Sequence, residues 1–448
     1  MLFLYNTASK KKEKFSPINE KLPKMYVCGP TVYSSAHLGN ARPVIVFDVL
    51  YRYFLQKYKD VLYVRNITDI DDKIYKASIE KGIDINNLTK ATTKKFHEDM
   101  ENLNSIPPTI EPRATDHINE MISMITSLID GGYAYKTDDG HVFFKTESYK
   151  NYGKLSRRST EDQKNNIRID NKESKKNAND FVLWKPSENP IPGWDSPFGF
   201  GRPGWHIECS AMSDKYLGTP FDIHGGGIDL VFPHHENEIA QSCCAVDSVN
   251  MANIWMHNGH LTVNGEKMSK STGNILLVND LLKKYSGEVI RLVILKTNYR
   301  QVLDWKDEII IEAKNQIEKA LSIIHEFENI KIDKDDNSFD EDIVKAIEDD
   351  LNTSLAITIL FKKLRESKGN EVEVKKLINT SQKILGLLLN IEKKKLTISE
   401  EEINNKIKDR NLARKNKDFQ KSDIIRDELD SMGVVIKDTS NGTTWKIK

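Results

Sequence analysis

The chain has 448 residues and a mass of 51.3 kDa, more than one ordinary hydrophobic core organises, so we expect two to four domains. No run approaches the roughly 18 apolar residues of a membrane-spanning helix. The 66 Lys and Arg residues balance the 66 Asp and Glu residues, which argues against a protein that binds nucleic acid through its overall charge alone.

Only four cysteines occur, too few for the disulfide framework of a small secreted protein. The N-terminal segment MLFLYNTASKKKEK places its apolar residues before its charges and lacks a small-residue cleavage site, so it is not typical of a secretory signal. We therefore expect a cytoplasmic protein without a membrane segment, whose cysteines are buried, reactive or bound to a metal.

The first hundred residues predict the start of a parallel sheet. The β-rich segment KMYVCGPTVY runs into a glycine-containing turn and a helical pattern over residues 40–58, with Pro43 in its first turn. A second apolar run, VLYVRNIT, begins at Val61, and a polar helical stretch follows to Leu103. Strand, turn, helix and strand in this order predict a doubly wound α/β domain.

From about Ser105 the pattern changes. DGGYAYKTDDGHVFFK predicts a hairpin, and a long polar segment follows it. Near Gly199 the strand-and-glycine pattern returns in GFGRPGWHIECSAM and FDIHGGGIDLVFPHHENEIAQ, so we interpret the intervening residues as an insertion that splits one nucleotide-binding domain. After Tyr299 the chain becomes helical to about Ile391. The terminal module is expected to hold one basic helix, ARKNKDFQKSDIIRDEL, and a hairpin around Asn441-Gly442.

Four potential metal ligands occur in the split domain. His234 and Glu238 are four residues apart at the start of a predicted helix, so both face one side of it. Cys28 is predicted at the C-terminal end of the first sheet strand, and Cys209 on a later strand of the same sheet. Two thiolates, one imidazole and one carboxylate suit tetrahedral zinc.

Each of these residues taken alone is more often structural, because a buried cysteine is usually a core residue and HHENE is compatible with a solvated helix start. The four together favour a metal site. Cys243 and Cys244 are rival thiols, but adjacent helical residues point to different faces, so we interpret both as packing residues.

Two segments indicate nucleotide binding. In HLGNARP a helix N-terminus offers free N–H groups to phosphate: His37 can donate to its oxygens, Gly39 permits close approach and Asn40 is placed as the N-cap. Many helices begin in this way, so the pattern is weak by itself. KMSKS adds Lys267 and Lys270, which can neutralise a triphosphate and the pyrophosphate that leaves it. The chain has no G-x-x-x-x-G-K-[ST] loop.

A series of motifs covers the chain almost from end to end. In order they read MYVCGPTVY, HLGNARP, YVRNITDIDDKI, EPRATDHI, DFVLWK, GRPGWHIECSAM, FDIHGGGIDLVFPHHENEIAQS, KMSKSTGN and, near the C-terminus, ARKNKDF, SDIIRDEL and GTTWK. In combination they are highly specific, and the chain resembles the cysteinyl-tRNA synthetases, a family of class I aminoacyl-tRNA synthetases. Departures are few: Ser34 stands where an acidic residue is common, and Asn179 where proline often precedes the DFVLWK motif.

The resemblance implies a ligase that activates L-cysteine with ATP to cysteinyl-adenylate and pyrophosphate, and then transfers cysteine to the 3′ end of tRNA(Cys). It implies one Zn²⁺ per chain on Cys28, Cys209, His234 and Glu238, with the substrate thiolate entering the coordination sphere, and Mg²⁺ with ATP. A pocket that used size alone would separate cysteine from serine only about 10- to 200-fold. Zinc is therefore expected to act as the selectivity filter.

The resemblance also assigns the remaining site residues. Those expected around the amino acid are Thr68, Trp205, His224 and Asp229. Those expected at ATP are His37, Gly39, Asn40, Lys267, Met268, Ser269, Lys270 and Ser271, of which His37, Asn40, Lys267 and Lys270 are expected to be catalytic. Those expected at the anticodon are Arg414, Phe419 and Asp423, with Phe419 standing where a tryptophan can occur.

The implied architecture is a class I Rossmann-like parallel-sheet catalytic domain split by an insertion, followed by an α-helical bundle and a small C-terminal α+β anticodon-binding module. The expected boundaries are 1–110 and 199–250 for the two halves of the catalytic domain, 111–198 for the insertion on the acceptor-stem side, 251–315 for the KMSKS-bearing stem-contact region, 316–395 for the bundle and 396–448 for the anticodon module.

Two other functions remain open at this point. One is an ATP-dependent ligase that joins cysteine to a small amine, like the mycothiol ligases, which lack the terminal module. The other is a non-catalytic zinc-containing RNA-binding protein, which has no use for HLGN and KMSKS together. We expect a monomer, since nothing in the sequence demands an oligomer.

Overall fold

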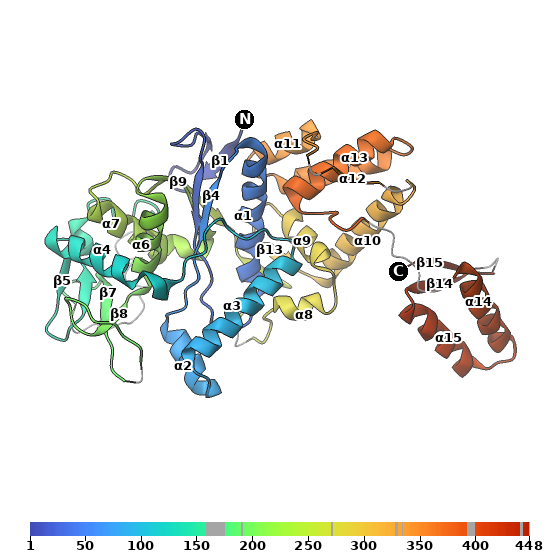
Figure 1. Cartoon of the computed structure of the whole chain (residues 1–448), viewed down its shortest axis with the longest axis horizontal. Coiled ribbons are helices and arrows are strands. Elements are labelled where there is room, and N and C mark those ends of the chain that lie inside the picture. Colours follow the sequence, from blue (N-terminus) through green and yellow to red (C-terminus); the bar gives the residue numbers. More distant parts are fainter. Residues whose placement is uncertain are drawn as a thin grey trace. The chain divides into compact units, whose positions relative to one another are not determined.

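The computed structural model contains a four-stranded parallel sheet (Figure 1). Its strands, in the order in which they lie side by side, are β10 (Ala252–Asn258), β9 (Phe221–Gly227), β3 (Lys24–Val27) and β4 (Leu62–Arg65). All three pairings are parallel. Two strands precede residue 66 and two follow residue 220, so one sheet is built from both sides of the insertion. The predicted parallel α/β fold is confirmed.

The structure describes residues 1–157, 175–189, 191–269, 272–327, 330–333, 335–391, 399–439 and 442–447. They divide into two units, residues 1–389 and residues 390–448. Within the described segments, no helix combines the length and the apolar character needed to cross a membrane. The predicted domain boundaries are finer than this division and stay predictions.

Helix α1 (Leu38–Lys57) follows β3 and packs against the sheet with almost all of its length buried. Its N-cap is His37, in extended backbone conformation, and Asn40 is the third helical residue. The prediction that Asn40 is the N-cap was therefore wrong. The Asn40 side chain instead accepts a hydrogen bond from the His37 N–H at 3.2 Å. Because the helix begins earlier than predicted, Pro43 lies in its second turn rather than its first.

An antiparallel sheet in the order β5-β6-β7-β8 lies between β4 and β9 in the sequence, and its last strand lies beyond the predicted insertion of residues 111–198. Its strands are β5 (Ala134–Lys136), β6 (Val142–Phe144), β7 (Phe181–Pro186) and β8 (Gly201–Pro203). Strands β5 and β6 form the predicted hairpin. The polar segment between them and β7 lies largely outside the described residues. Phe144 and Trp184 share one buried core with Cys28 and Cys209, so the insertion supports the candidate metal site.

Three helices accompany this core: α4 (Ile118–Asp130), α6 (Trp205–Leu217) and α7 (Glu236–Ala245). Cys209 lies in α6, so its prediction on a strand was wrong. Ile207 to Ser213 of α6 are all buried. A short helix buried on every side has no polar face, and its sequence cannot be told from a buried strand by periodicity. Cys243 is buried in the same core and Cys244 packs against it, as predicted.

The KMSKS hairpin belongs to a small sheet in the order β12-β11-β13. These strands are β11 (Leu261–Val263), β12 (Glu266–Lys267) and β13 (Leu303–Trp305). β13 is a short strand in a region that was predicted to be helical. It pairs in parallel with β11 and completes the sheet.

Helices make up most of the remaining larger unit. They are α2 (Asp72–Lys81), α3 (Ile85–Asn102), α8 (Val278–Leu282), α9 (Gly287–Lys296), α10 (Asp307–Ile324), α11 (Glu341–Glu348), α12 (Thr353–Glu366) and α13 (Glu371–Thr380). The N-terminal hairpin of β1 (Phe3–Asn6) and β2 (Lys11–Lys14) packs beside β10.

The smaller unit has a core of its own, formed by α14 (Glu400–Lys415), α15 (Phe419–Ser431), β14 (Val434–Thr439) and β15 (Gly442–Ile447). The single predicted basic helix is two helices. The helical conformation is interrupted at Lys417, whose φ of 63° is left-handed, and the Asp418 side chain caps α15. β14 and β15 form the predicted antiparallel hairpin, while Asn441 at its turn lies outside the described residues.

Candidate active site

The four predicted metal ligands converge from distant parts of the sequence onto one buried point. Cys28 directly follows β3, and Cys209 lies in the second turn of α6. His234 belongs to the irregular turn Val231–His235, and Glu238 lies in the first turn of α7. The exposed fraction of each residue is at most 9%, so their donor atoms are largely shielded from water.

The distances between the donor atoms suit a tetrahedral metal ion. Sγ of Cys28 lies 3.7 Å from Sγ of Cys209, 3.5 Å from Nε2 of His234 and 3.5 Å from Oε1 of Glu238. In a tetrahedral site with zinc bonds of about 2.0–2.3 Å, neighbouring donors are about 3.3–3.8 Å apart. The ion-paired Nε2 of His234 and Oε1 of Glu238 are closer, at 2.9 Å.

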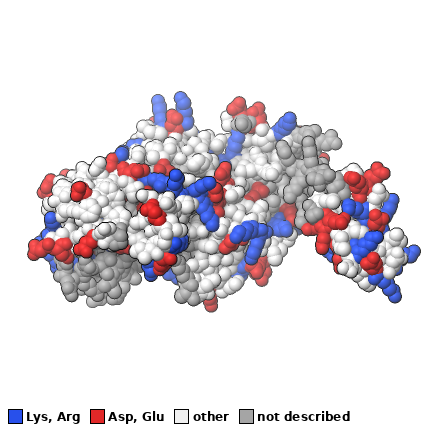
Figure 2. Space-filling model, turned by 60° about the horizontal axis from the view of Figure 1, so that its bottom comes forward, with Lys and Arg blue, Asp and Glu red and all other residues white. Residues whose placement is uncertain are grey.

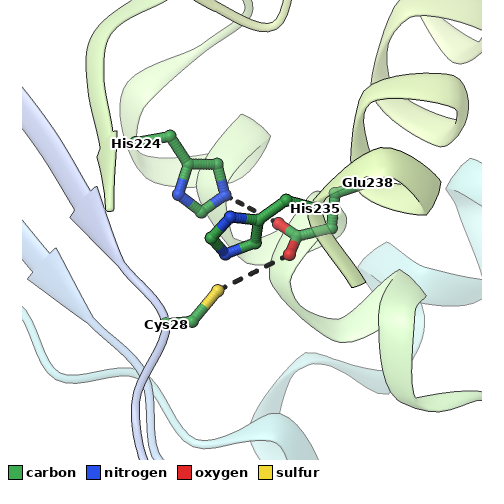
Figure 3. Close-up of side chains that lie close together, drawn as sticks. All are labelled: Cys28, His224, His235 and Glu238. Carbon is green, nitrogen blue, oxygen red and sulfur yellow. Dashed lines mark hydrogen bonds and ion pairs between the residues drawn. The ribbon is translucent and has the colours of Figure 1, made fainter. Parts of the chain in front are cut away.

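A second set of donors overlaps the first. Cys28, His224, His235 and Glu238 also lie within reach of one point (Figure 3). In this set His224 is engaged through Nε2, 2.8 Å from the other carboxylate oxygen of Glu238, and Nδ1 of His235 is 2.7 Å from Nε2 of His257. We therefore place His224 as the residue that orients the Glu238 carboxylate. The first set, with two sulfurs, is the better zinc site.

The charges of the first set call for a cation. Burial and the hydrogen bond with Cys209 hold the pKa of Cys28 well above its usual value. Only a bound cation would therefore make both cysteines thiolates and balance the three negative charges that result. Hydrogen bonding from Cys28 lowers the pKa of Cys209 to about 6. Burial opposes the charged form of His234, but the Glu238 carboxylate raises its pKa to about 10. Burial likewise opposes the charge of Glu238, yet His234 and His224 hold its pKa well below the usual range. The donor set thus fits a divalent, sulfur-preferring metal ion.

Neighbouring side chains hold the donors in place. Nδ1 of His206 lies 2.8 Å from Nδ1 of His234, and the Trp205 ring stacks on the His234 ring with centroids 4.2 Å apart. The Cys209 thiol donates to Oδ1 of Asn66 at 3.7 Å. Neither Asn66 nor His206 was predicted as a site residue, although they stand within the motifs YVRNITDIDDKI and GRPGWHIECSAM. Polar contacts of this kind orient metal ligands and tune their affinity.

The residues expected around the amino acid fall into two groups. Trp205 and Asp229 line the cavity that opens beside Cys28. Thr68 and His224 are buried. Nε2 of His224 contacts Glu238 directly at 2.8 Å, whereas Thr68 reaches the donor set through Asn66, which donates to its Oγ1 at 3.1 Å. The structure therefore gathers all four near the donor set, two at the cavity wall and two beneath it.

The first nucleotide motif lines the same cavity, which has a volume of about 600 Å³. Its wall includes Cys28 at one side and His37, Gly39 and Asn40 at the start of α1. A Cβ added to Gly39 would stand 3.0 Å from Nδ1 of His37 and 3.4 Å from Cε of Met268, so the backbone is closely approached at this point. An anion bound here would meet the positive end of the α1 dipole.

The second nucleotide motif reaches the cavity through Lys267 and Met268. Lys267 ends β12, and Sδ of Met268 accepts a hydrogen bond from the N–H of Leu276 at 3.4 Å. The N–H of Ser269 donates to Oδ1 of Asn274 at 2.9 Å, so Asn274, which was not predicted as a site residue, shapes the loop. The two remaining predicted residues, Lys270 and Ser271, lie outside the described residues.

The expected anticodon residues lie in the smaller unit. Arg414 in α14 pairs with Asp438 of β14, which also receives a bidentate pair of hydrogen bonds from Arg410 at 2.9 Å each. The Phe419 side chain at the start of α15 is 62% exposed, and Asp423 one turn later is also exposed. A large exposed aromatic ring offers a stacking surface to an unpaired base.

Two family profiles match the chain. Residues 14–315 match the profile described as "tRNA synthetases class I (C) catalytic domain", and residues 400–445 match "Cysteinyl-tRNA ligase anticodon binding domain". The chain belongs to the cysteinyl-tRNA synthetases. The first profile alone covers more than half of the residues and includes every predicted metal and nucleotide residue, and the second covers the three predicted anticodon residues.

Curated relatives of this family match over the full length. The "Cysteine--tRNA ligase" of Pelagibacter ubique is 46% identical over 456 residues, spanning 100% of the chain and 99% of the relative. That of Beijerinckia indica is 47% identical with the same coverage. The protein of the same name from Wolbachia pipientis wMel is 48% identical, over 99% of the chain and 100% of the relative.

Solved structures with a related fold are far more distant in sequence. A Mycobacterium tuberculosis methionyl-tRNA synthetase in complex with methionyl-adenylate has a TM-score of 0.59 and 15% identity, over 82% of the chain and 92% of that structure. An Agrobacterium radiobacter K84 LeuRS–tRNA–LeuAMS complex has a TM-score of 0.57 and 10% identity, over 83% of the chain and 85% of that structure. These similarities show the class I fold in this member of the family.

Proposed function

We propose that the chain is a cysteine–tRNA ligase in which Cys28, Cys209, His234 and Glu238 hold one zinc ion, and in which ATP occupies the adjoining cavity. The observation that carries the proposal is that Cys28, one sulfur of a buried two-sulfur donor set, and the N-terminus of α1 line the same cavity of about 600 Å³. A site for a thiol and a site for a triphosphate thus lie next to each other, as the joining of cysteine to a nucleotide requires.

In the first half-reaction the carboxylate of cysteine attacks the α-phosphorus of ATP. A new O–P bond forms, the bond from that phosphorus to the bridging oxygen breaks, and pyrophosphate leaves together with Mg²⁺. No nucleophile from the protein is needed, so the chain contributes position and charge. His37 and the N–H groups of α1 bind the phosphate, while Lys267 and Lys270 neutralise the leaving pyrophosphate.

In the second half-reaction a hydroxyl of the 3′-terminal ribose of tRNA attacks the activated carbonyl. The ester forms, the bond to the phosphate breaks, and AMP leaves. The chain again orients the reactants, since the leaving group is already activated. Asp229 at the cavity wall is a carboxylate suited to the substrate ammonium group, and Trp205 forms an apolar wall beside His234.

Selection of the amino acid depends on the donor set. Bound zinc would favour a deprotonated sulfur over the neutral hydroxyl of serine, by a margin that pocket size alone cannot supply. The protein's part is to hold two thiolates and a carboxylate in fixed positions. His206 fixes the His234 ring and His224 fixes the Glu238 carboxylate.

The smaller unit supports tRNA(Cys) as the acceptor. Arg414, Phe419 and Asp423 are proposed to contact the anticodon, with the exposed Phe419 ring as the stacking surface. Figure 2 shows Lys and Arg interspersed with Asp and Glu, and the net charge of the chain is zero, so local patches must bind the polyanion. We further propose that the protein acts as a cytoplasmic monomer, with the domain boundaries given above.

Transfer of labelled cysteine to total tRNA in the presence of ATP tests the function, with labelled serine as the control. We expect cysteine to be transferred and serine not. Metal analysis of the purified protein should find one zinc per chain. Another metal with full activity would contradict the zinc assignment and leave the reaction intact.

Two results would redirect the assignment. Cysteine-dependent exchange of pyrophosphate into ATP without charging of tRNA would indicate a ligase that uses a small amine as the acceptor. Binding of tRNA without either reaction would indicate a non-catalytic RNA-binding protein.

A further inference from the structure

Hydrogen bonds join the two nucleotide motifs, HLGNARP and KMSKS, through the backbone segments that flank them. Residues 259–278 follow β10 and extend to the first residue of α8, and we call them the KMSKS segment. Both ends of its described part attach to the first motif. At the downstream end, the N–H of Leu38 donates to the carbonyl of Leu276, and the N–H of Val278 donates to the carbonyl of Ala36, both at 2.9 Å. The residues that lead into α1 therefore pair antiparallel with the downstream end of the KMSKS segment, with His37 opposite Leu277.

Arg42 attaches the upstream end. It is 1% exposed, and its guanidinium donates to five backbone carbonyls and to no side chain in the described ranges. Two of these carbonyls, on Gly259 and His260, lie at the start of the KMSKS segment, at 2.8 and 2.6 Å from Nη1. The other three lie just before β13, on Asn298, Tyr299 and Gln301.

These carbonyls belong to the two chain segments that enter β11 and β13. Because those strands pair in parallel, Leu261 opposite Leu303, Arg42 binds the common base of the small sheet that carries Lys267. Backbone contacts reinforce this base, since the N–H of Gly259 donates to the carbonyl of Tyr299 at 2.7 Å. One guanidinium on α1 thus contacts both chain segments at the base of this sheet.

The charge of Arg42 points to a specific role rather than to ordinary packing. Among the described residues, no aspartate or glutamate forms an ion pair with it, and burial lowers its pKa to about 10, so it stays cationic at neutral pH. A buried cation held only by carbonyl dipoles is costly compared with an apolar residue of similar size. The planar fork of arginine can, however, hold several carbonyls in one fixed geometry, which an ammonium cannot.

We propose that Arg42 is a positioning residue for adenylate formation. Its guanidinium fixes the base of the KMSKS hairpin to the helix whose N-terminus binds the ATP phosphate, so that the lysines of the second motif meet the leaving pyrophosphate. This inference rests on the proposed ATP site and adds a residue of the cavity wall whose guanidinium binds the backbone of the KMSKS segment. Arg42 and the start of α1 together then hold both ends of the KMSKS segment.

Arg42→Lys is the decisive variant, because it keeps the positive charge and loses the fork. We expect kcat for cysteine-dependent ATP–pyrophosphate exchange to fall about 10²-fold, as a displacement of about 1 Å at a reacting group can cause. KM for cysteine and the zinc content should not change, since the donor set lies on other elements. Arg42→Gln should behave similarly. Near-normal exchange in Arg42→Lys with a loss only in Arg42→Gln would overturn the positioning role and leave a purely electrostatic one.

A second variant changes the backbone that Arg42 binds and leaves Arg42 itself in place. Gly259→Ala would place a Cβ 2.4 Å from the carbonyl oxygen of Gln301 and displace the bound carbonyls while Arg42 is intact. It should reproduce the loss of kcat. In both variants we expect faster hydrogen exchange at the amides of β11 than in the wild type, since the base of the hairpin is released. Wild-type rates of amide hydrogen exchange in β11 together with an unchanged kcat would overturn the proposal.

Arg52→Lys is the matched control. Arg52 lies on the same helix, is 8% exposed and also donates to backbone carbonyls, those of Asn104 and Gln382, but it does not contact the KMSKS segment. We expect it to lower the melting temperature while kcat stays close to the wild-type value. Equal losses of kcat in Arg42→Lys and Arg52→Lys would refute the inference. Failure of the wild type to exchange pyrophosphate would instead refute the proposed function.

Discussion

Removal of the His206 imidazole tests the metal site from outside the donor set. Nδ1 of His234 lies 2.8 Å from Nδ1 of His206, and a metal ion bound at Nε2 of His234 would leave the ring proton on Nδ1, as the donor to His206. This contact restrains the side-chain torsion angles of His234 and so the direction in which its Nε2 points. His206→Ala would leave that N–H without its acceptor and free the ring to turn away from the other donors.

The expected loss of zinc affinity in His206→Ala depends on the contacts that His234 keeps. Loss of an outer hydrogen bond to a metal-bound histidine costs about 10- to 100-fold in metal affinity. His234 keeps its stacking on Trp205 at 4.2 Å and its contact with Glu238 at 2.9 Å, so most of its orientation survives. We therefore expect the lower end of that range, about tenfold or about 1.4 kcal/mol in binding free energy.

Competition with a chromogenic chelator measures the zinc affinity, and steady-state pyrophosphate exchange measures KM for each substrate. We expect weaker zinc binding and a higher KM for cysteine, with KM for ATP unchanged. His206→Asn supplies the matched control, because the amide places a polar group close to the position of Nδ1 and should recover part of the affinity. Wild-type zinc affinity in His206→Ala would refute the reasoning, as would an equal rise of both KM values.

Three further predictions follow from particular residues. Cys209→Ser should weaken zinc retention and cysteine activation together, and full zinc occupancy with normal activation would contradict the ligand set. Lys270→Ala should keep zinc and slow adenylate formation in single-turnover assays, and an unchanged rate would refute its role. Burial raises the pKa of Asp99 to about 6, above the value of about 4 in an unfolded chain. Protons are therefore bound more tightly by the folded state, and stability falls as the pH rises from about 4 to about 6. Asp99→Asn should accordingly raise the melting temperature at pH 7 and give little gain at pH 4; equal effects at both pH values would contradict this.

Local patterns in the sequence were sufficient for much of the architecture. The alternation of apolar runs, glycine turns and a long helix around Cys28 predicts a parallel sheet, and the two hairpins in the insertion and near the C-terminus were also recognised. Residue chemistry was equally informative at the site. Two cysteines, a histidine and a glutamate suggest zinc wherever they lie in the chain, because ligand preference depends on atom type.

The boundaries and roles of single elements were less predictable, since burial removes the periodicity on which such predictions depend. Helix α6 was taken for a strand because all its faces are covered. Asn40 was taken for the N-cap because its residue type is typical of that position, whereas the extended backbone at His37 starts the helix earlier. β13 was missed because three residues carry no measurable pattern.

The sequence by itself determined the set of groups available: the thiols, imidazoles, lysines and glycine turns, and the order in which the motifs follow one another. Only the tertiary structure shows that His224 and His235 form a second donor set that overlaps the predicted one, because the sequence does not show which side chains converge. The role of Arg42 was likewise invisible in sequence, because its partners are backbone carbonyls more than 200 positions away. Main-chain acceptors are identical in every residue, so only the folded chain can show where they converge.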